Sequence, residues 1–116
     1  MKKIGIVGNR NGWTKKEVFK ILEEYGFIGE NINIITGGAE GVDSYAMEYA
    51  KNKGCVLTVY YPDKIAYLSP VCYYKRNKRI AWNCDILIAF NRKKYSGTLI
   101  TINFAKDFNK EVIIKE

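Results

Sequence analysis

Short apolar runs alternate with longer amphipathic segments along the whole chain. Runs of this length, rich in Ile and Val, are typical of strands that lie buried in a parallel sheet. They predict five strands, over residues 3–8, 32–35, 55–60, 86–90 and 111–114.

The segments between these runs carry apolar residues at helical spacing. Thr14 and Glu17 predict a capping box at the start of the first helix, and Ser69 with Pro70 predicts the start of the third. Strands that alternate with helices form βαβ units with right-handed crossovers. We therefore expect one α/β domain over residues 1–116, a minimal Rossmann-like three-layer fold whose five-stranded, mainly parallel sheet has helices on both faces. The predicted helices cover 14–25, 43–53, 69–81 and 97–105.

A glycine-rich turn joins the second strand to the second helix and organises the chain. Gly37, Gly38 and Gly41 fall within five residues there. A turn without side chains lets a ligand approach the backbone amides, and the helix N-terminus behind it favours an anion, most often phosphate. The alternative is that these glycines only allow a tight turn and close packing of the helix on the sheet.

Ligands of such folds bind outside the carboxyl ends of the strands, where the strand order reverses. The loops at this edge are expected at 8–12, 36–41, 61–69 and 91–97. Three of them carry basic residues, namely Arg10, Lys64 and the group 92–94.

The composition limits which partners, metal sites and catalytic groups we expect. The 116 residues carry a net charge of +7, which favours an anionic partner without choosing between nucleotide, nucleic acid and acidic surface. The chain has no histidine, and its three cysteines lack CxxC spacing, so we expect no metal site and no histidine-dependent catalysis. The GxGxxG and GKT/GKS fingerprints are both missing, which argues against an NAD dehydrogenase and a P-loop ATPase, and we expect no cofactor. We read no signal peptide and no run of membrane-spanning length, and we expect a soluble cytoplasmic protein without a membrane partner.

Six short motifs resemble the SLOG superfamily when taken in order and spacing. The closest resemblance is to its small YspA-like members, and the DprA/Smf proteins and LOG phosphoribohydrolases are more distant relatives. The motifs are Gly8-x-Arg10, Gly37-Gly38-Ala39-x-Gly41-Val42-Asp43, Tyr61-Pro62-Asp63, Arg76-Asn77, Asp85-x-x-Ile88-Ala89-Phe90 and Gly97-Thr98.

The resemblance implies that the glycine loops hold a nucleotide or a nucleotide-derived ligand. Arg10 would pair with phosphate, Arg76 would face phosphate and sugar, and Asn77 departs from the lysine usual in LOG enzymes. From the residues alone, Arg76 could instead be a surface cation or a partner of Asp85. The expected ligand-binding residues are Gly8, Asn9, Arg10, Gly37, Gly38, Ala39, Glu40, Gly41, Asp43, Arg76, Asn77, Ser96, Gly97 and Thr98.

The resemblance to LOG enzymes implies a catalytic glutamate pair after Gly97-Thr98, and this chain lacks it. Glycosidic cleavage needs a carboxylate near the sugar, so we expect binding without turnover, by a sensor or sponge for a nucleotide signal. Some SLOG domains of anti-phage systems recognise cyclic nucleotides derived from NAD. We expect Asp43 to cap its helix rather than to act in catalysis.

Two alternatives remain from the sequence. A nucleoside monophosphate phosphoribohydrolase would use Arg76 with Glu40 or Asp63, and a DprA-like protein would bind single-stranded nucleic acid. A homo-oligomer is also expected, with the aromatic helix 71–82 as its interface. The tyrosines that could stack on a base are Tyr60, Tyr61, Tyr67, Tyr73 and Tyr74.

Overall fold

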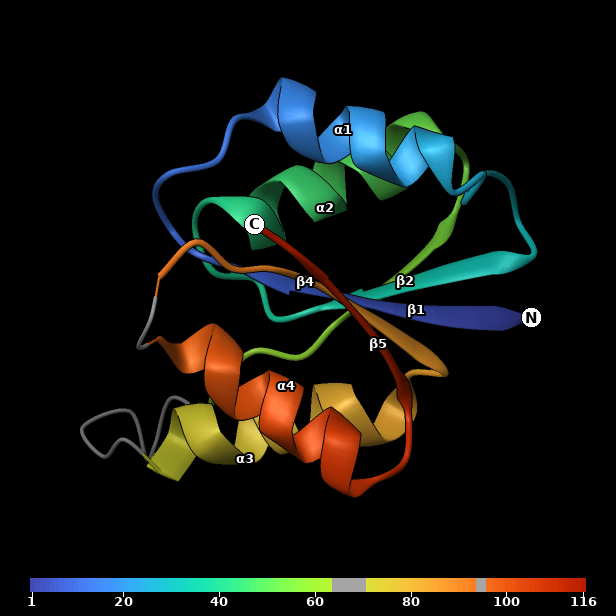
Figure 1. The fold of residues 1–116 in the computed structure, drawn as a ribbon. Helices are drawn as coiled ribbons and strands as arrows, with labels where there is room; N and C mark the ends of the chain where they lie inside the picture. The colour runs from blue at the N-terminus through green and yellow to red at the C-terminus, as the bar shows by residue number, and fades with distance from the viewer. Residues whose placement is uncertain (64–70, 94–95) are drawn as a thin grey trace.

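A computed structural model describes residues 1–63, 71–93 and 96–116 (Figure 1). The predicted helix start at Ser69 and Pro70 lies outside the described residues, as do Lys64, Tyr67 and Lys94. The elements are β1 (Lys2–Gly8), α1 (Lys15–Glu24), β2 (Ile32–Thr36), α2 (Val42–Asn52), β3 (Val56–Val59), α3 (Val71–Asn83), β4 (Ile86–Phe90), α4 (Gly97–Asp107) and β5 (Glu111–Lys115).

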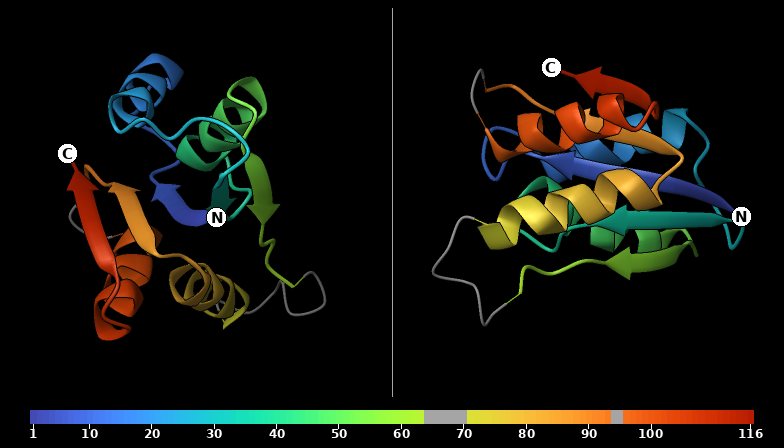
Figure 2. Two further views of the ribbon diagram at one scale, coloured as in Figure 1. Left: turned by 90° about the vertical axis from the view of Figure 1, so that its right-hand side faces the viewer. Right: turned by 90° about the horizontal axis from the view of Figure 1, so that it is seen from below.

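The five strands form one sheet in the order β3-β2-β1-β4-β5, and every neighbouring pair is parallel. In the central strand, Ile4 is in register with Ile34 of β2 and Ile86 of β4. Helices α1 and α2 cover one face of the sheet, and α3 and α4 cover the other (Figures 1 and 2). The predicted Rossmann-like α/β fold is confirmed.

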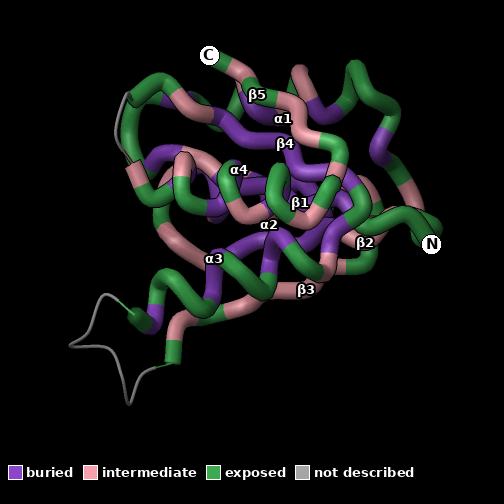
Figure 3. The backbone as a smooth tube through the Cα atoms, turned by 60° about the horizontal axis from the view of Figure 1, so that its bottom comes forward, coloured by how far each residue is buried: buried purple, intermediate pink, exposed green. Residues whose placement is uncertain are grey.

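A hydrophobic core fills each side of the sheet. Leu22 and Tyr49 belong to the core under α1 and α2, whereas Ile80 and Ile102 belong to the core under α3 and α4. Every residue of β4 is buried, as the tube in Figure 3 shows. Because both faces are covered, the loops at the carboxyl edge are left to build a site.

The start of α1 follows directly from its sequence. The Thr14 hydroxyl accepts a hydrogen bond from the Glu17 amide at 3.1 Å, and the Glu17 carboxylate accepts one from the Thr14 amide at 3.0 Å. This is the predicted capping box, and it fixes where the loop after β1 ends.

The described helices are short and amphipathic. Within residues 1–63, 71–93 and 96–116, none is long and apolar enough to cross a membrane.

Candidate functional site

A cavity of about 540 Å³ opens at the carboxyl edge of the sheet, between the ends of β1 and β4. The strand order reverses at this point, because β2 and β3 lie on one side of β1 while β4 and β5 lie on the other. The cavity is lined by Val7, Gly8, Asn9, Arg10, Asn11, Ala39, Asp43, Tyr73, Arg76, Asn77, Ile80, Lys93, Ser96, Gly97, Thr98 and Thr101.

The fold brings together most of the residues expected to bind a ligand, from four separate segments. Gly37, Gly38, Glu40 and Gly41 are not among the lining residues. Those expected residues that line the cavity are Gly8, Asn9, Arg10, Ala39, Asp43, Arg76, Asn77, Ser96, Gly97 and Thr98.

The glycine loop is bound by the protein's own side chains. The Arg76 guanidinium donates a hydrogen bond to the Gly37 carbonyl at 2.5 Å, and the Ala39 amide donates one to the Asp43 carboxylate at 3.2 Å. A Cβ atom at Gly37 would lie 2.6 Å from Arg76 Nη1. The loop amides were expected to bind phosphate. The Ala39 amide instead donates its hydrogen bond to the Asp43 carboxylate.

Asp43 is a buried acid in the wall of the cavity, with 5% of its surface exposed. Burial raises its pKa to about 6, and the Ala39 hydrogen bond and the positive charge of Arg76 oppose that rise. The expected role as helix cap is wrong. Gly41 is the N-cap of α2, and Asp43 already lies in the first turn, where it binds the loop instead.

Arg76 is buried and reaches from α3 to the glycine loop. Its Nε atom donates a hydrogen bond to Asn77 Oδ1 at 2.8 Å. Burial lowers the pKa of the guanidinium, and the nearby Asp43 carboxylate counteracts this. An arginine nevertheless remains charged in a folded protein, so the cavity wall carries a fixed positive charge.

The two alternatives for Arg76 are both wrong. It is not a surface cation, and Asp85 has a different partner, since its Oδ2 accepts a hydrogen bond from the Lys3 amide at 2.9 Å. That bond holds the start of β4 against β1, at the edge of the sheet opposite the cavity.

Asn9 joins the loops after β1 and β4. Its Oδ1 accepts a hydrogen bond from the Arg92 amide at 2.8 Å, and its Nδ2 donates one to Asn91 Oδ1 at 3.1 Å. The Ser96 hydroxyl donates to the same Asn91 oxygen at 3.0 Å. These polar groups hold the mouth of the cavity in shape.

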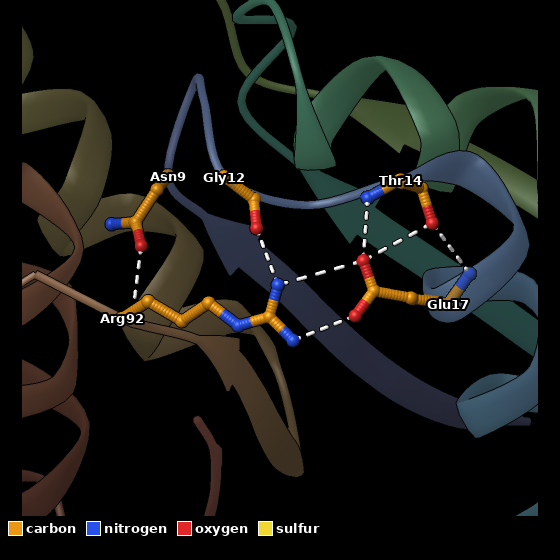
Figure 4. Close-up of polar contacts among 5 residues, drawn as sticks. All are labelled: Asn9, Gly12, Thr14, Glu17 and Arg92. Atoms are coloured by element: carbon orange, nitrogen blue, oxygen red, sulfur yellow. Dashed lines mark hydrogen bonds and ion pairs between the residues drawn. The ribbon is translucent and has the colours of Figure 1, made fainter.

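The Arg92 side chain strengthens this connection (Figure 4). Its guanidinium pairs with Glu17 at 2.6 Å, donates a hydrogen bond to the Gly12 carbonyl and lies 3.6 Å from the ring centroid of Trp13. The Arg92 hydrogen bond is the main reason why the pKa of Glu17 falls to about 2. Of the basic group 92–94, Arg92 thus binds the loop after β1 and the first turn of α1, and Lys93 lines the cavity.

Positive charge prevails in the cavity. Among its described lining residues, Arg10, Arg76 and Lys93 are basic, and Asp43 alone is acidic. The N-terminus of α4 also faces the cavity through Gly97 and Thr98, and no side chain within the described residues caps it. Unpaired amides and the helix dipole make such an end attractive to an anion.

Six lining residues are not among those expected to bind a ligand, namely Val7, Asn11, Tyr73, Ile80, Lys93 and Thr101. Tyr73 and Lys93 stood out in the sequence only as a ring that could stack on a base and as part of the basic group 92–94, and the other four did not stand out. Helical spacing could have found two of them. Ile80 follows Arg76 by four residues, and Thr101 follows Thr98 by three, which places each pair on one helix face. Nothing in the sequence distinguishes Val7 and Asn11 from other strand and loop residues.

The carboxylates expected to serve an enzyme lie elsewhere. Glu40 and Asp63 are exposed and do not line the cavity, so the structure does not bring them to Arg76 as a catalytic group. Among the described residues, no group of three or more Cys, Asp and Glu side chains could hold a metal ion.

The parallel sheet and its covering helices define a Rossmann-like α/β protein, which has a cavity with mostly basic charged residues at the switch point. The family described as DNA recombination-mediator protein A matches residues 48–116, which is more than half of the chain. The chain belongs to this family. The sequence motifs indicated DprA/Smf proteins as distant relatives, and this is the relationship that is found. The closer resemblance to YspA-like proteins stays a prediction.

Two solved structures share the fold. DNA processing protein A from Streptococcus pneumoniae superposes with a TM-score of 0.77 at 23% identity, over 97% of this chain and 50% of that one. The Helicobacter pylori protein gives a TM-score of 0.72 at 20% identity, over 97% of this chain and 64% of that one, and its structure is described as showing a single-stranded DNA binding mode. This chain thus spans about half to two thirds of their lengths. No curated protein sequence matches the chain.

Proposed function

We propose that this protein binds single-stranded nucleic acid and holds one nucleotide of the strand in the cavity. The observation that carries this proposal is the set of charges in the cavity wall. Arg10, Arg76 and Lys93 lie there with the N-terminus of α4 and one buried acid. In this arrangement Arg10, Lys93 and the amides of Gly97 and Thr98 receive a phosphate.

The shape of the site favours a single strand over a duplex. A cavity of about 540 Å³ has the size of pockets that enclose small ligands, so it fits one nucleotide. In a duplex the bases are stacked and paired, and entry would require a base to be extruded. An unpaired strand offers its nucleotides without this cost. Membership of the recombination-mediator family and the net charge of +7 support the same partner.

Binding proceeds without cleavage in this proposal. Asp43 is the one acidic residue among the described lining residues, and its carboxylate accepts the Ala39 hydrogen bond. A buried carboxylate held by the loop is poorly placed to guide water to a sugar. Asp43 instead supports the glycine loop and limits how much positive charge the cavity accumulates.

A free nucleotide-type ligand, as a sensor or sponge would bind, is the second candidate. The cavity volume favours it, because the pocket encloses one nucleotide and needs no further strand to be filled. The two candidates differ in what the residues outside the cavity contribute. A strand gains from the charge of the surrounding surface, whereas a mononucleotide depends on the cavity alone.

Fluorescence anisotropy with a labelled 20-mer of thymidine tests the proposal. We expect the single strand to bind more tightly than a duplex of equal length, and affinity to fall steeply between 50 and 200 mM salt, as phosphate contacts require. Arg10→Ala should weaken strand binding about tenfold or more, because it removes a charged hydrogen-bond donor from phosphate. Lys51→Ala is the matched control, since it removes one exposed charge of α2 outside the cavity.

The outcomes separate the candidates. Equal effects of Arg10→Ala and Lys51→Ala, or no binding of the single strand, contradict the proposal. Thymidine monophosphate that competes as well as the 20-mer on a molar basis, with little salt dependence, supports the free-nucleotide ligand instead.

A further inference from the structure

Four aromatic side chains form a continuous row on α3, on α4 and at the residue that caps the end of α4. The ring centroids of Tyr74 and Phe104 lie 4.8 Å apart, those of Phe104 and Phe108 lie 6.1 Å apart, and those of Phe108 and Trp82 lie 5.0 Å apart. At the two ends of the row, Tyr74 is 52% exposed and Trp82 is 62% exposed. We call this row the α3–α4 stripe. It leaves large aromatic surfaces open to solvent, although burial of such rings is favourable.

The stripe continues from the cavity. Tyr73 lines the cavity, and Tyr74 is the next residue of the same helix. Trp82 follows Tyr74 by eight residues, or roughly 12 Å along α3. Because α3 and α4 lie side by side on one face of the sheet (Figures 1 and 2), a chain that leaves the cavity can follow this surface.

Basic residues flank the aromatic rings. Residues 71–83 of α3 contain no Asp or Glu and four Lys and Arg side chains, of which Arg76 is buried at the cavity and Arg79 lies over the Tyr60 ring. Helix α4 adds Lys106 and a single acid, Asp107. Lys78 lies one turn from both Tyr74 and Trp82, on the same ridge of the helix. The Lys110 ammonium group lies 5.4 Å from the ring centroid of Trp82. The two exposed rings of the stripe, Tyr74 and Trp82, therefore have lysine side chains beside them.

The positive charge of this surface decides whether a second copy of the chain or a nucleic-acid strand binds the α3–α4 stripe. A two-fold interface between two copies would place the surface against itself, so the basic side chains of α3 would face those of the other copy. Like charges in contact oppose such an interface. A single strand satisfies both features, because its phosphates pair with the cations and its unpaired bases stack on the rings.

We propose that the α3–α4 stripe is a second binding region for the single strand, on which bases stack after the strand leaves the cavity. This inference rests on the proposed function. It replaces the expectation that helix 71–82 forms an oligomer interface, and self-association becomes an outcome of the test.

The test compares a trimer and a 15-mer of thymidine, each labelled at the end, on wild-type protein and variants. Trp82→Ala should weaken binding of the 15-mer about 5- to 100-fold and leave the trimer unchanged, because only the longer strand reaches the distal ring. Lys78→Ala should reduce the salt slope of 15-mer binding by about one. Both side chains are exposed, and circular dichroism checks that each variant folds.

Tyr25→Ala is the matched control. Tyr25 is an exposed aromatic residue at the end of α1, on the opposite face of the sheet, and it also has a lysine, Lys115, over its ring at 5.1 Å. We expect this variant to bind both strands as the wild type does.

Intrinsic fluorescence gives a second readout. The chain has two tryptophans, and Trp13 is 7% exposed. Base stacking should therefore quench Trp82, and quenching by the 15-mer should disappear in Trp82→Ala.

Several results would overturn the inference. If Trp82→Ala behaves like Tyr25→Ala while Arg10→Ala still weakens binding, the stripe is not used but the proposed function stands. If no strand binds the wild type, both fail. If sedimentation velocity shows a dimer that Trp82→Ala dissociates, a second copy occupies the stripe.

Discussion

The Arg92 guanidinium and the Glu17 carboxylate, 75 residues apart in the chain, form an ion pair of 2.6 Å that connects the loop after β4 to the start of α1. Trp13 lies beneath the same guanidinium, at 3.6 Å from its ring centroid. The loops joined in this way carry Arg10 and Lys93, the two exposed cations of the cavity. The Arg92–Glu17 pair thus holds the loops of Arg10 and Lys93 together, although neither member of the pair lines the cavity.

Loss of the contacts that the Arg92 guanidinium makes with Glu17 and Gly12 should weaken strand binding, because the loops that carry Arg10 and Lys93 are then held less firmly. Lysine keeps the charge but cannot make the paired contacts to Glu17 and Gly12. We expect Arg92→Lys and Glu17→Gln to lower strand affinity by a similar factor, about threefold to tenfold, with an unchanged salt slope. Anisotropy at several salt concentrations measures both quantities. A reduced salt slope in Arg92→Ala with normal binding by Arg92→Lys would instead mark Arg92 as a direct phosphate ligand.

The same pair predicts how stability depends on acid. The pKa of Glu17 is about 2 in the folded protein and 4.5 in the unfolded chain. Its stabilising contribution is therefore fully present above pH 4.5 and is lost as the pH falls towards 2. Thermal unfolding of wild type and Glu17→Gln between pH 2 and 6 should show a difference that shrinks to nothing at the acidic end. A constant difference would contradict the pairing.

Strand binding should strengthen as the pH falls through 6. Asp43 is the acidic member of the cavity wall, and its raised pKa of about 6 means that it loses its negative charge at mildly acidic pH. A neutral acid repels phosphate less, so we expect affinity at pH 5.5 to exceed that at pH 7.5 by about threefold to tenfold. The chain has no histidine that could produce the same effect.

The Asp43→Asn variant serves as the control for this dependence. It should bind at pH 7.5 at least as tightly as the wild type and show no change between the two values. In the wild type, the ionisation of Asp43 affects the free energy of unfolding with the opposite sign from that of Glu17. A buried acid with a raised pKa costs stability as the pH rises from about 4 to 6. Wild-type affinity that falls at pH 5.5 would contradict the placement of phosphate near Asp43.

Gly41 should tolerate substitution far less than Gly54. Both have positive φ angles, 77° and 68°, which cost a Cβ-bearing residue about 1 kcal/mol even in the left-handed helical region, and Gly41, with ψ −126°, lies outside that region. At Gly41 the new Cβ would also overlap the backbone of Arg10, whereas nothing lies within 4 Å at Gly54. We expect Gly41→Ala to lower the free energy of unfolding by about 3 kcal/mol and Gly54→Ala by about 1 kcal/mol. Urea unfolding measures both, and equal losses would argue against this packing of the two loops.

Local sequence predicted the fold because local interactions determine its elements. The Thr14–Glu17 capping box lies within one helical turn, and the apolar run Ile86–Phe90 can be recognised as a strand from its own residues. The motif that begins at Gly97 also marked the start of α4 correctly. Alternation of such elements leaves few possible topologies.

The site was less predictable, because its geometry depends on contacts between distant segments. Whether the glycine-loop amides face a ligand depends on Asp43 and Arg76, and Arg76 comes from another helix 39 residues beyond Gly37. Likewise, the sequence shows Arg92 as one cation of a basic loop, and only the fold places Glu17 beside it. The sequence therefore predicted which kinds of residue build the site better than it predicted which residues they bind.

An NMR titration of ¹⁵N-labelled protein with an unlabelled thymidine 15-mer shows whether the strand enters the cavity. We expect the amide signals of Arg10, Lys93, Gly97 and Thr98 to shift first and most. Amides of α1, and of α2 beyond its first turn, should stay in place, because these parts lie on the other face of the sheet and do not line the cavity. Shifts confined to surfaces away from the cavity, or no shifts at millimolar strand, would contradict the account.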